Sequence, residues 1–115
     1  MTDTSIPSLL SHFPKTEQSV PLINPVSAKR VTDVPQMSAD QVSEAMTKLR
    51  AAAKDWAETP VRERAKAIAR LHDVMFENQD KLLDVLQLET GKSRAHAFEE
   101  FAGAAGSARY YGKHS

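Results

Sequence analysis

The spacing of apolar residues changes once along the chain, at Pro35. Before it, residues 20–34 hold two short β-prone runs, Val20–Ile23 and Arg30–Val34, on either side of an Asn24-Pro25 turn signal. Such a pattern predicts a β-hairpin over 20–34. After it, apolar residues recur every three or four positions, which predicts helices over 38–57, 60–90 and 93–111. The expected fold is mainly α with one N-terminal β-hairpin.

Residues that start and stop helices divide the region 38–111. Ser38 followed by Gln41 forms a capping box at the start of the first helix. Thr59-Pro60 ends that helix and begins the second, because Pro is favoured at the first helical position. Residues 78–80 kink or re-cap the second helix, and Gly91 is suited to its C-terminus.

Each helix carries an apolar stripe that needs a partner. We expect the stripe between Val42 and Trp56 to pack against the stripe between Val61 and Leu88. The last helix has a face of small residues that includes Gly103 and Gly106. Gly in a helix interior lowers helix stability, so two of them suggest a packing reason. We expect another backbone or a ligand to approach this face closely. Neither it nor the hairpin has an obvious partner in the chain.

Composition excludes several classes of function. The 15 basic and 15 acidic residues cancel, whereas nucleic-acid binding requires a basic excess. No apolar run is long enough to cross a bilayer, and residues 1–20 lack the features of a secretory signal, so we expect a cytoplasmic location. We interpret residues 1–19 as a flexible tail; the alternative is a docking turn around Ile6–Phe13.

Candidate chemistry is sparse. The sequence contains no Cys, so it offers neither a thiolate nucleophile nor a thiolate metal ligand. The four His residues are too far apart in sequence for a helical zinc motif. His72 falls on an apolar stripe, where a core or boundary role is expected rather than that of a base.

Four strings, in order, resemble one family. Residues 20–25 followed by 31–35 resemble the N-P…V-P hairpin that opens aldehyde dehydrogenases, and residues 51–64 resemble their A-x-x-x-W…P-x-x-x-R segment. Residues 88–92 match L-E-T-G-K, and residues 102–111 resemble A-G-A-A…R-Y-Y. The resemblance covers about residues 20–112. Residues 55–57 and 76–79 are most similar to bacterial succinate-semialdehyde dehydrogenases, while Ala28 replaces the usual turn Gly.

The resemblance implies an incomplete piece of an α/β fold. Residues 20–115 would be the N-terminal part of the cofactor-binding domain, with residues 38–111 forming helices that cover a Rossmann-like sheet. The parent enzymes are homo-oligomers that use NAD or NADP. Their thiolate attacks the aldehyde, the nicotinamide takes the hydride, and a glutamate activates water. The strings that carry these groups do not occur here, so we expect this chain alone to be inactive and to bind no cofactor.

Three further roles are implied by the resemblance. The Glu89 carboxylate, with backbone carbonyls of Leu22 and Ile23, would hold a structural monovalent cation, and the alternative is a solvated glutamate. Glu99 and Gly103 resemble positions that line the substrate entrance, against the alternative of ordinary helix packing. We expect packing rather than catalysis from Tyr110 and Tyr111.

Two functions remain open. The chain is either a truncated aldehyde dehydrogenase or a stand-alone helical scaffold that binds other proteins. In both cases its unpartnered apolar faces predict self-association.

Overall fold

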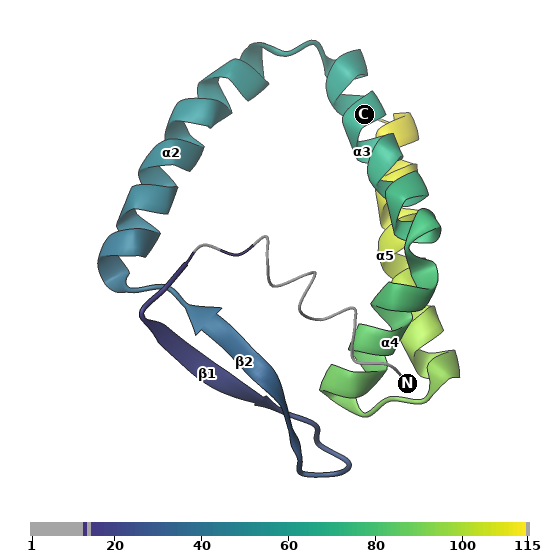
Figure 1. Cartoon of the computed structure of the whole chain (residues 1–115). Coiled ribbons are helices and arrows are strands. Elements are labelled where there is room, and N and C mark those ends of the chain that lie inside the picture. The colour runs from purple at the N-terminus through teal and green to yellow at the C-terminus, as the bar shows by residue number, and fades with distance from the viewer. Residues whose placement is uncertain (1–12, 14, 115) are drawn as a thin grey trace.

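The computed structural model describes residue 13 and residues 15–114. The described elements are, in chain order, β1 (Gln18–Ile23), β2 (Arg30–Gln36), α2 (Ala39–Glu58), α3 (Val61–Glu77), α4 (Gln79–Thr90) and α5 (Arg94–His114). The prediction of a mainly helical chain with an N-terminal hairpin is confirmed (Figure 1). Most of the expected tail 1–19 lies outside the described residues, but Gln18 and Ser19 belong to β1. No described helix is both long and apolar enough to cross a membrane.

The two strands pair antiparallel and extend beyond the predicted 20–34 at both ends. Gln18 lies opposite Gln36, and the register shifts between Leu22 and Ile23 near the turn. Two backbone hydrogen bonds close the turn: the Asn24 amide donates to the Lys29 carbonyl, and the Ala28 amide donates to the Asn24 carbonyl, both at 2.9 Å. Ala28 has φ of +56°, the left-handed conformation that a Gly adopts without strain.

Helix α2 is built by local interactions. The Ser38 hydroxyl accepts a hydrogen bond from the Gln41 amide, and the Gln41 side chain accepts one from the Ser38 amide, which confirms the capping box. The helix ends at Glu58, because Thr59 is extended ahead of Pro60. None of its 20 residues is buried.

The predicted helix 60–90 is two helices. Asn78 separates α3 from α4 with φ of −112° and ψ of 16°. Its side-chain amide donates to the Val74 carbonyl at 2.9 Å. Such local bonds from Asn side chains compete with the backbone hydrogen bonds of a helix. The polar run 78–80 therefore ends one helix and begins the next.

The core lies where α3, α4 and α5 meet. Leu83, Ala97 and Phe101 are fully buried, and Met75, Leu82 and Leu86 pack around them. The Phe76 ring meets the Phe101 ring edge-on, with centroids 5.1 Å apart. Arg94 ties the start of α5 to α4 through Asp80 at 2.8 Å and Asp84 at 2.5 Å.

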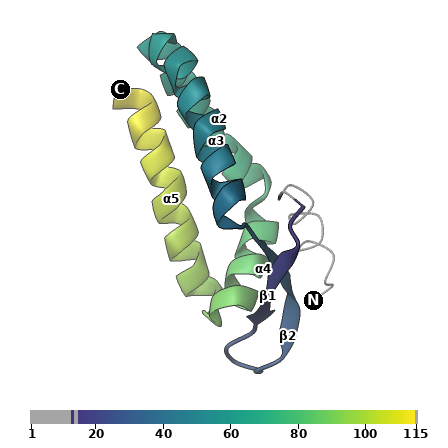
Figure 2. The same cartoon turned by 90° about the vertical axis from the view of Figure 1, so that its left-hand side faces the viewer.

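Helix α5 packs beside α3 with Ala105 and Ala108 buried, but the small-residue face with Gly103 and Gly106 has no neighbour among the described residues. The expected packing of α2 is wrong. Its stripe does not pack against α3 and α4: Val42, Met46, Leu49 and Trp56 are exposed, and α2 makes no extensive contact with another described element. From the short Thr59-Pro60 connection, α2 and α3 diverge instead of lying side by side (Figure 1). Figure 2 views the molecule from the side of α2, with α5 beside the overlapping helices α2 and α3.

The molecule is consequently open. Its radius of gyration is 17.0 Å, whereas a compact domain near this size has about 13 Å. Figure 1 shows α2 and the hairpin on one side and the α3–α4–α5 cluster on the other. Among the described residues, no other element covers the inner side of α2.

Candidate functional site

Asn24 joins the hairpin turn to the end of α4. Its side-chain oxygen accepts hydrogen bonds from the Val26 amide at 3.0 Å and the Ser27 amide at 2.8 Å, which fixes the turn. Its side-chain nitrogen donates to the carbonyl of Leu88 at 2.8 Å, across 64 residues of chain. One side chain therefore places the turn against the L-E-T-G-K segment.

Gly91 completes this junction from the other side. It ends α4 with φ of +71°, and its amide donates to the Gln87 carbonyl at 2.9 Å. A Cβ atom at this position would lie 2.7 Å from Val26 Cγ2 and 3.1 Å from the Pro25 ring. Glycine is therefore required both by the backbone conformation and by the turn that packs on it.

The predicted cation ligands come from the two segments that meet here. Ile23 precedes Asn24, and Glu89 follows Leu88, so the Asn24–Leu88 bond brings Glu89 near the end of β1. Glu89 is exposed, and among the described residues nothing pairs with its carboxylate. In the part of the chain that the structure describes, no group of three or more His, Asp or Glu side chains is arranged to hold a metal ion. Any cation here would depend on one carboxylate with backbone carbonyl oxygens, a set of ligands that suits a hard cation.

Glu99 and Gly103 lie on the open face of α5. Both residues are exposed, and a Cβ at Gly103 would meet nothing within 4 Å. The face that carries them is opposite to the face that buries Ala97, Phe101 and Ala105. Within the described residues 15–114, no other element covers their side of α5.

The histidine and tyrosine candidates have no catalytic arrangement in the described chain. His72 is a boundary residue: its Nδ1 lies 3.0 Å from Asp73 Oδ1 and its ring lies 4.8 Å from that of Phe76. Tyr110 and Tyr111 are mostly exposed, and their rings meet edge-on at 5.4 Å. The Tyr110 ring also stacks on the His114 ring, with centroids 4.5 Å apart.

The described residues do not fit a nucleotide. Cofactor phosphates bind at a glycine-rich turn between a strand and a helix. Gly103 and Gly106 instead lie inside α5, and the described strands are the two of the hairpin. No step of cofactor chemistry is assigned to these residues.

The sequence did not reveal that Asn24 bonds to Leu88, or that Gly112 is the glycine at which α5 approaches α3 closely. A Cβ at Gly112 would lie 2.8 Å from the Ala69 backbone nitrogen, whereas Gly103 and Gly106, expected to allow close approach, face open space. The Asn24-Pro25 pair signalled a turn, but not its partner. Nothing in the local sequence distinguishes Gly112 from the other two.

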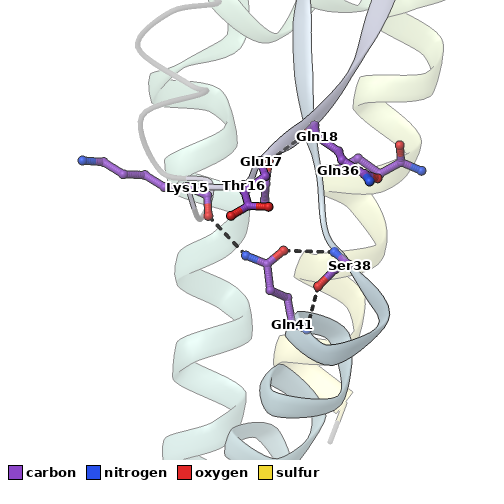
Figure 3. Close-up of a pocket in the computed structure, with 7 residues that line it drawn as sticks. All are labelled: Lys15, Thr16, Glu17, Gln18, Gln36, Ser38 and Gln41. Carbon is purple, nitrogen blue, oxygen red and sulfur yellow. Dashed lines mark hydrogen bonds between the residues drawn. The ribbon is translucent and has the colours of Figure 1, made fainter.

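A hollow of about 480 Å³ lies where the hairpin meets the start of α2 (Figure 3). Its lining is polar: Lys15, Thr16, Glu17, Gln18, Gln36, Ser38 and Gln41. The Gln41 side chain donates to the Lys15 carbonyl at 3.3 Å and accepts from the Ser38 amide, while the Lys15 amine points away from the hollow. These bonds serve the cap of α2.

Two exposed ion pairs outside the junction shift the pKa of one of their members. A hydrogen bond from Lys48, with its charge, lowers the pKa of Glu44 on α2. Hydrogen bonding to Glu77, with the negative charge of that residue, raises the pKa of Arg70 on α3. Both pairs are exposed, so each contributes little to stability.

Comparison with known proteins identifies the family of the chain. The model of the aldehyde dehydrogenase family matches residues 12–115. A protein of Mycolicibacterium smegmatis, named for a succinate-semialdehyde dehydrogenase that uses NADP(+), is 41% identical over 84% of this chain and 19% of its own length. A similarly named protein of Mycobacterium tuberculosis is 41% identical over 76% of this chain and 17% of its own. A glutarate-semialdehyde dehydrogenase of Pseudomonas aeruginosa is 32% identical over 84% and 20%.

This chain spans about a fifth of the length of these relatives. The junction of the hairpin turn with the L-E-T-G-K segment, and the helices on either side, all fall within the matched residues. Because the match covers nearly the whole chain, this protein belongs to the aldehyde dehydrogenase family.

Proposed function

We propose that this chain forms the N-terminal segment of an NAD(P)-dependent aldehyde dehydrogenase that oxidises a dicarboxylic semialdehyde, succinate semialdehyde in particular. The observation that carries the proposal is the 41% identity to the Mycolicibacterium smegmatis relative over 84% of the chain. Lower identity to the glutarate-semialdehyde relative favours the shorter substrate.

The role of the segment is to cover and hold other parts of the enzyme. It contains no Cys, so the thiolate that the family's chemistry requires must be supplied by residues outside it. What it does supply is a capped helix with an exposed apolar stripe and a hairpin fixed by one long-range hydrogen bond. Both are surfaces on which a second layer can pack.

A chimera tests this proposal. This chain would replace the matched fifth of the Mycolicibacterium smegmatis relative, and NADPH formation would be followed with succinate semialdehyde, glutarate semialdehyde and an uncharged aldehyde of similar length. We expect turnover of succinate semialdehyde at a rate comparable with that of the intact relative. A folded chimera without turnover, or one that prefers the uncharged aldehyde, would contradict the proposed activity.

The isolated 115-residue chain provides the matched control. With succinate semialdehyde and either NAD or NADP it should produce no reduced cofactor above a heat-treated sample, because it carries no thiolate. Clear turnover by the isolated chain would contradict the proposal that residues outside this segment supply the thiolate.

We propose further that Glu89, with the carbonyls of Leu22 and Ile23, holds a monovalent cation in the assembled enzyme. The contact between Asn24 and Leu88, which brings the two segments together, supports this site. In the chimera, replacing Na⁺ or K⁺ by choline should lower the thermal midpoint, and Glu89→Gln should abolish that difference. An equal response to choline in the Glu89→Gln variant would remove Glu89 from the site.

The second candidate is a stand-alone module that binds other proteins through α2. The absence of any buried residue in α2 favours it. The chimera separates the two functions: a module that does not belong to the enzyme would leave the chimera unfolded.

A further inference from the structure

The corner between α2 and α3 contains an apolar hollow with one arginine in its wall. The hollow has a volume of about 270 Å³ and is lined by Trp56, Val61, Arg64, Ala65 and Ile68. Trp56 comes from the last turns of α2, and the other four come from the first two turns of α3. Apolar side chains therefore surround a single charged group.

The guanidinium of Arg64 is not satisfied within the described chain. Its Nε atom is buried from solvent and has no hydrogen-bond partner there. The neighbouring acid, Glu63, is paired with Lys66 at 2.8 Å, and none of the described residues that line the hollow is acidic. Arginine cannot lose its proton in a protein, so a buried N–H of this kind needs an acceptor from elsewhere.

The groups around Arg64 indicate which kind of acceptor would bind it. A carboxylate suits it best, because a guanidinium and a carboxylate form paired, charge-assisted hydrogen bonds. The exposed sides of Trp56, Val61 and Ile68 call for an apolar side chain beside the carboxylate. About four-fifths of the length of the family relatives lies outside the segment that this chain matches, which is a sufficient source for such a group.

We propose that Arg64 anchors this segment to the remainder of the dehydrogenase chain by binding an acidic side chain that is flanked by an apolar residue seated in the hollow. The inference rests on the proposed function. It makes Arg64 a positioning residue at a contact between two parts of the enzyme, with no contact to substrate.

The chimera described above tests the anchor through its stability. Arg64→Met keeps the apolar stem and removes the guanidinium, and Arg62→Met is the matched control, since Arg62 lies on the same helix outside the hollow. We expect Arg64→Met to lower the thermal midpoint of the chimera by about 2 °C or more, and Arg62→Met to leave it unchanged. In the isolated chain both variants should unfold like the parent.

Arg64→Lys identifies the acid. The introduced lysine should be joined to the partner carboxylate by a zero-length carbodiimide, and mass spectrometry of the chimera would locate the amide bond. We expect a bond to an Asp or Glu of the relative's portion. A bond formed exclusively within residues 1–115, or equal midpoints for the Arg64→Met and Arg62→Met chimeras, would overturn the anchor.

The outcomes separate the two proposals. If Arg64→Met destabilises a folded chimera that does not oxidise succinate semialdehyde, the anchor stands and the proposed substrate fails. If Arg64→Met instead weakens only the self-association of the isolated chain, the partner is a second copy, and the anchor is overturned. A chimera that does not fold overturns both.

Discussion

Ala28 and Gly91 share the left-handed backbone conformation, with φ of +56° and +71°. For Gly91 the residue type and the backbone agree. For Ala28 they do not, because an L-residue in this conformation places its Cβ too close to the following carbonyl, at a cost of roughly 1–2 kcal/mol. The replacement of the usual turn Gly by Ala28 therefore introduces backbone strain at this position.

Ala28→Gly should stabilise the hairpin turn. Relief of the left-handed strain, less the entropy that Gly loses, should contribute about 1 kcal/mol. Amide exchange at Asn24 and Ala28, whose N–H groups close the turn, should slow by about fivefold. Unchanged or faster exchange would mean that the turn is not strained.

Gly91→Ala should detach the turn from α4. The added Cβ would meet Val26 at 2.7 Å in a backbone conformation that already disfavours Ala, so Asn24 should lose its bond to Leu88. We expect a loss of about 1–3 kcal/mol and increased proteolysis between residues 24 and 30. Gly103→Ala is the control: it fills open space inside a helix and should raise stability by about 1 kcal/mol.

At the scale of elements, contact between backbones decided which helices pair. Helix α5 carries alanines at its buried positions 97, 105 and 108, so α3 can approach closely along its length. Helix α2 has larger apolar residues at its stripe, yet Val42, Met46, Leu49 and Trp56 remain exposed. Its helicity accordingly depends on the Ser38–Gln41 cap and on local pairs such as Glu44–Lys48 at 2.7 Å.

Gly112→Ala should separate the C-terminal end of α5 from α3. The new Cβ would lie within 3 Å of the Ala69 backbone, which cannot move aside as a flexible side chain would. We expect a loss of about 1–3 kcal/mol, seen as a lower urea midpoint and faster exchange in residues 105–114. Gly106→Ala meets nothing within 4 Å and should be neutral or stabilising. Equal effects of the two substitutions would place the α3–α5 contact elsewhere.

At the scale of the whole molecule, few of the described residues are buried. The core that they form consists of Leu83, Phe101 and three alanines, and large apolar side chains such as Leu49, at 61% exposure, remain in contact with water. Exposed apolar patches of this kind are typical of interaction surfaces. The stability of the isolated chain should therefore be low and unequal between its two sides.

We propose that the isolated chain self-associates through these faces. Sedimentation should show species larger than a monomer, and Leu49→Glu on α2 should shift the distribution toward monomer, because the substitution places a charge in the exposed stripe. Arg50→Glu, next to it on α2, is the control. A monomer with slow exchange throughout residues 20–34 would instead favour a self-sufficient module.

The sequence by itself determined the elements and the family, because both depend on residues close together in the chain. The capping box at Ser38, the stop at Pro60 and the alternation in 20–34 act within one or two turns, so their consequences could be predicted to within a few residues. The break at Asn78 was signalled, but whether it would kink one helix or separate two depended on a competition between nearly equal local bonds. Four short strings sufficed for the family because their order and spacing are specific.

Only the tertiary structure decided which surfaces meet. The amide of Asn24 bonds to Leu88 across 64 residues, Gly112 rather than Gly103 is the close contact, and α5 rather than α2 covers α3. An apolar stripe indicates that a helix needs a partner without indicating which one, since apolar burial has no direction. Arg64 likewise could be recognised only in the tertiary structure, because its buried and unpaired N–H depends on the residues that line the hollow.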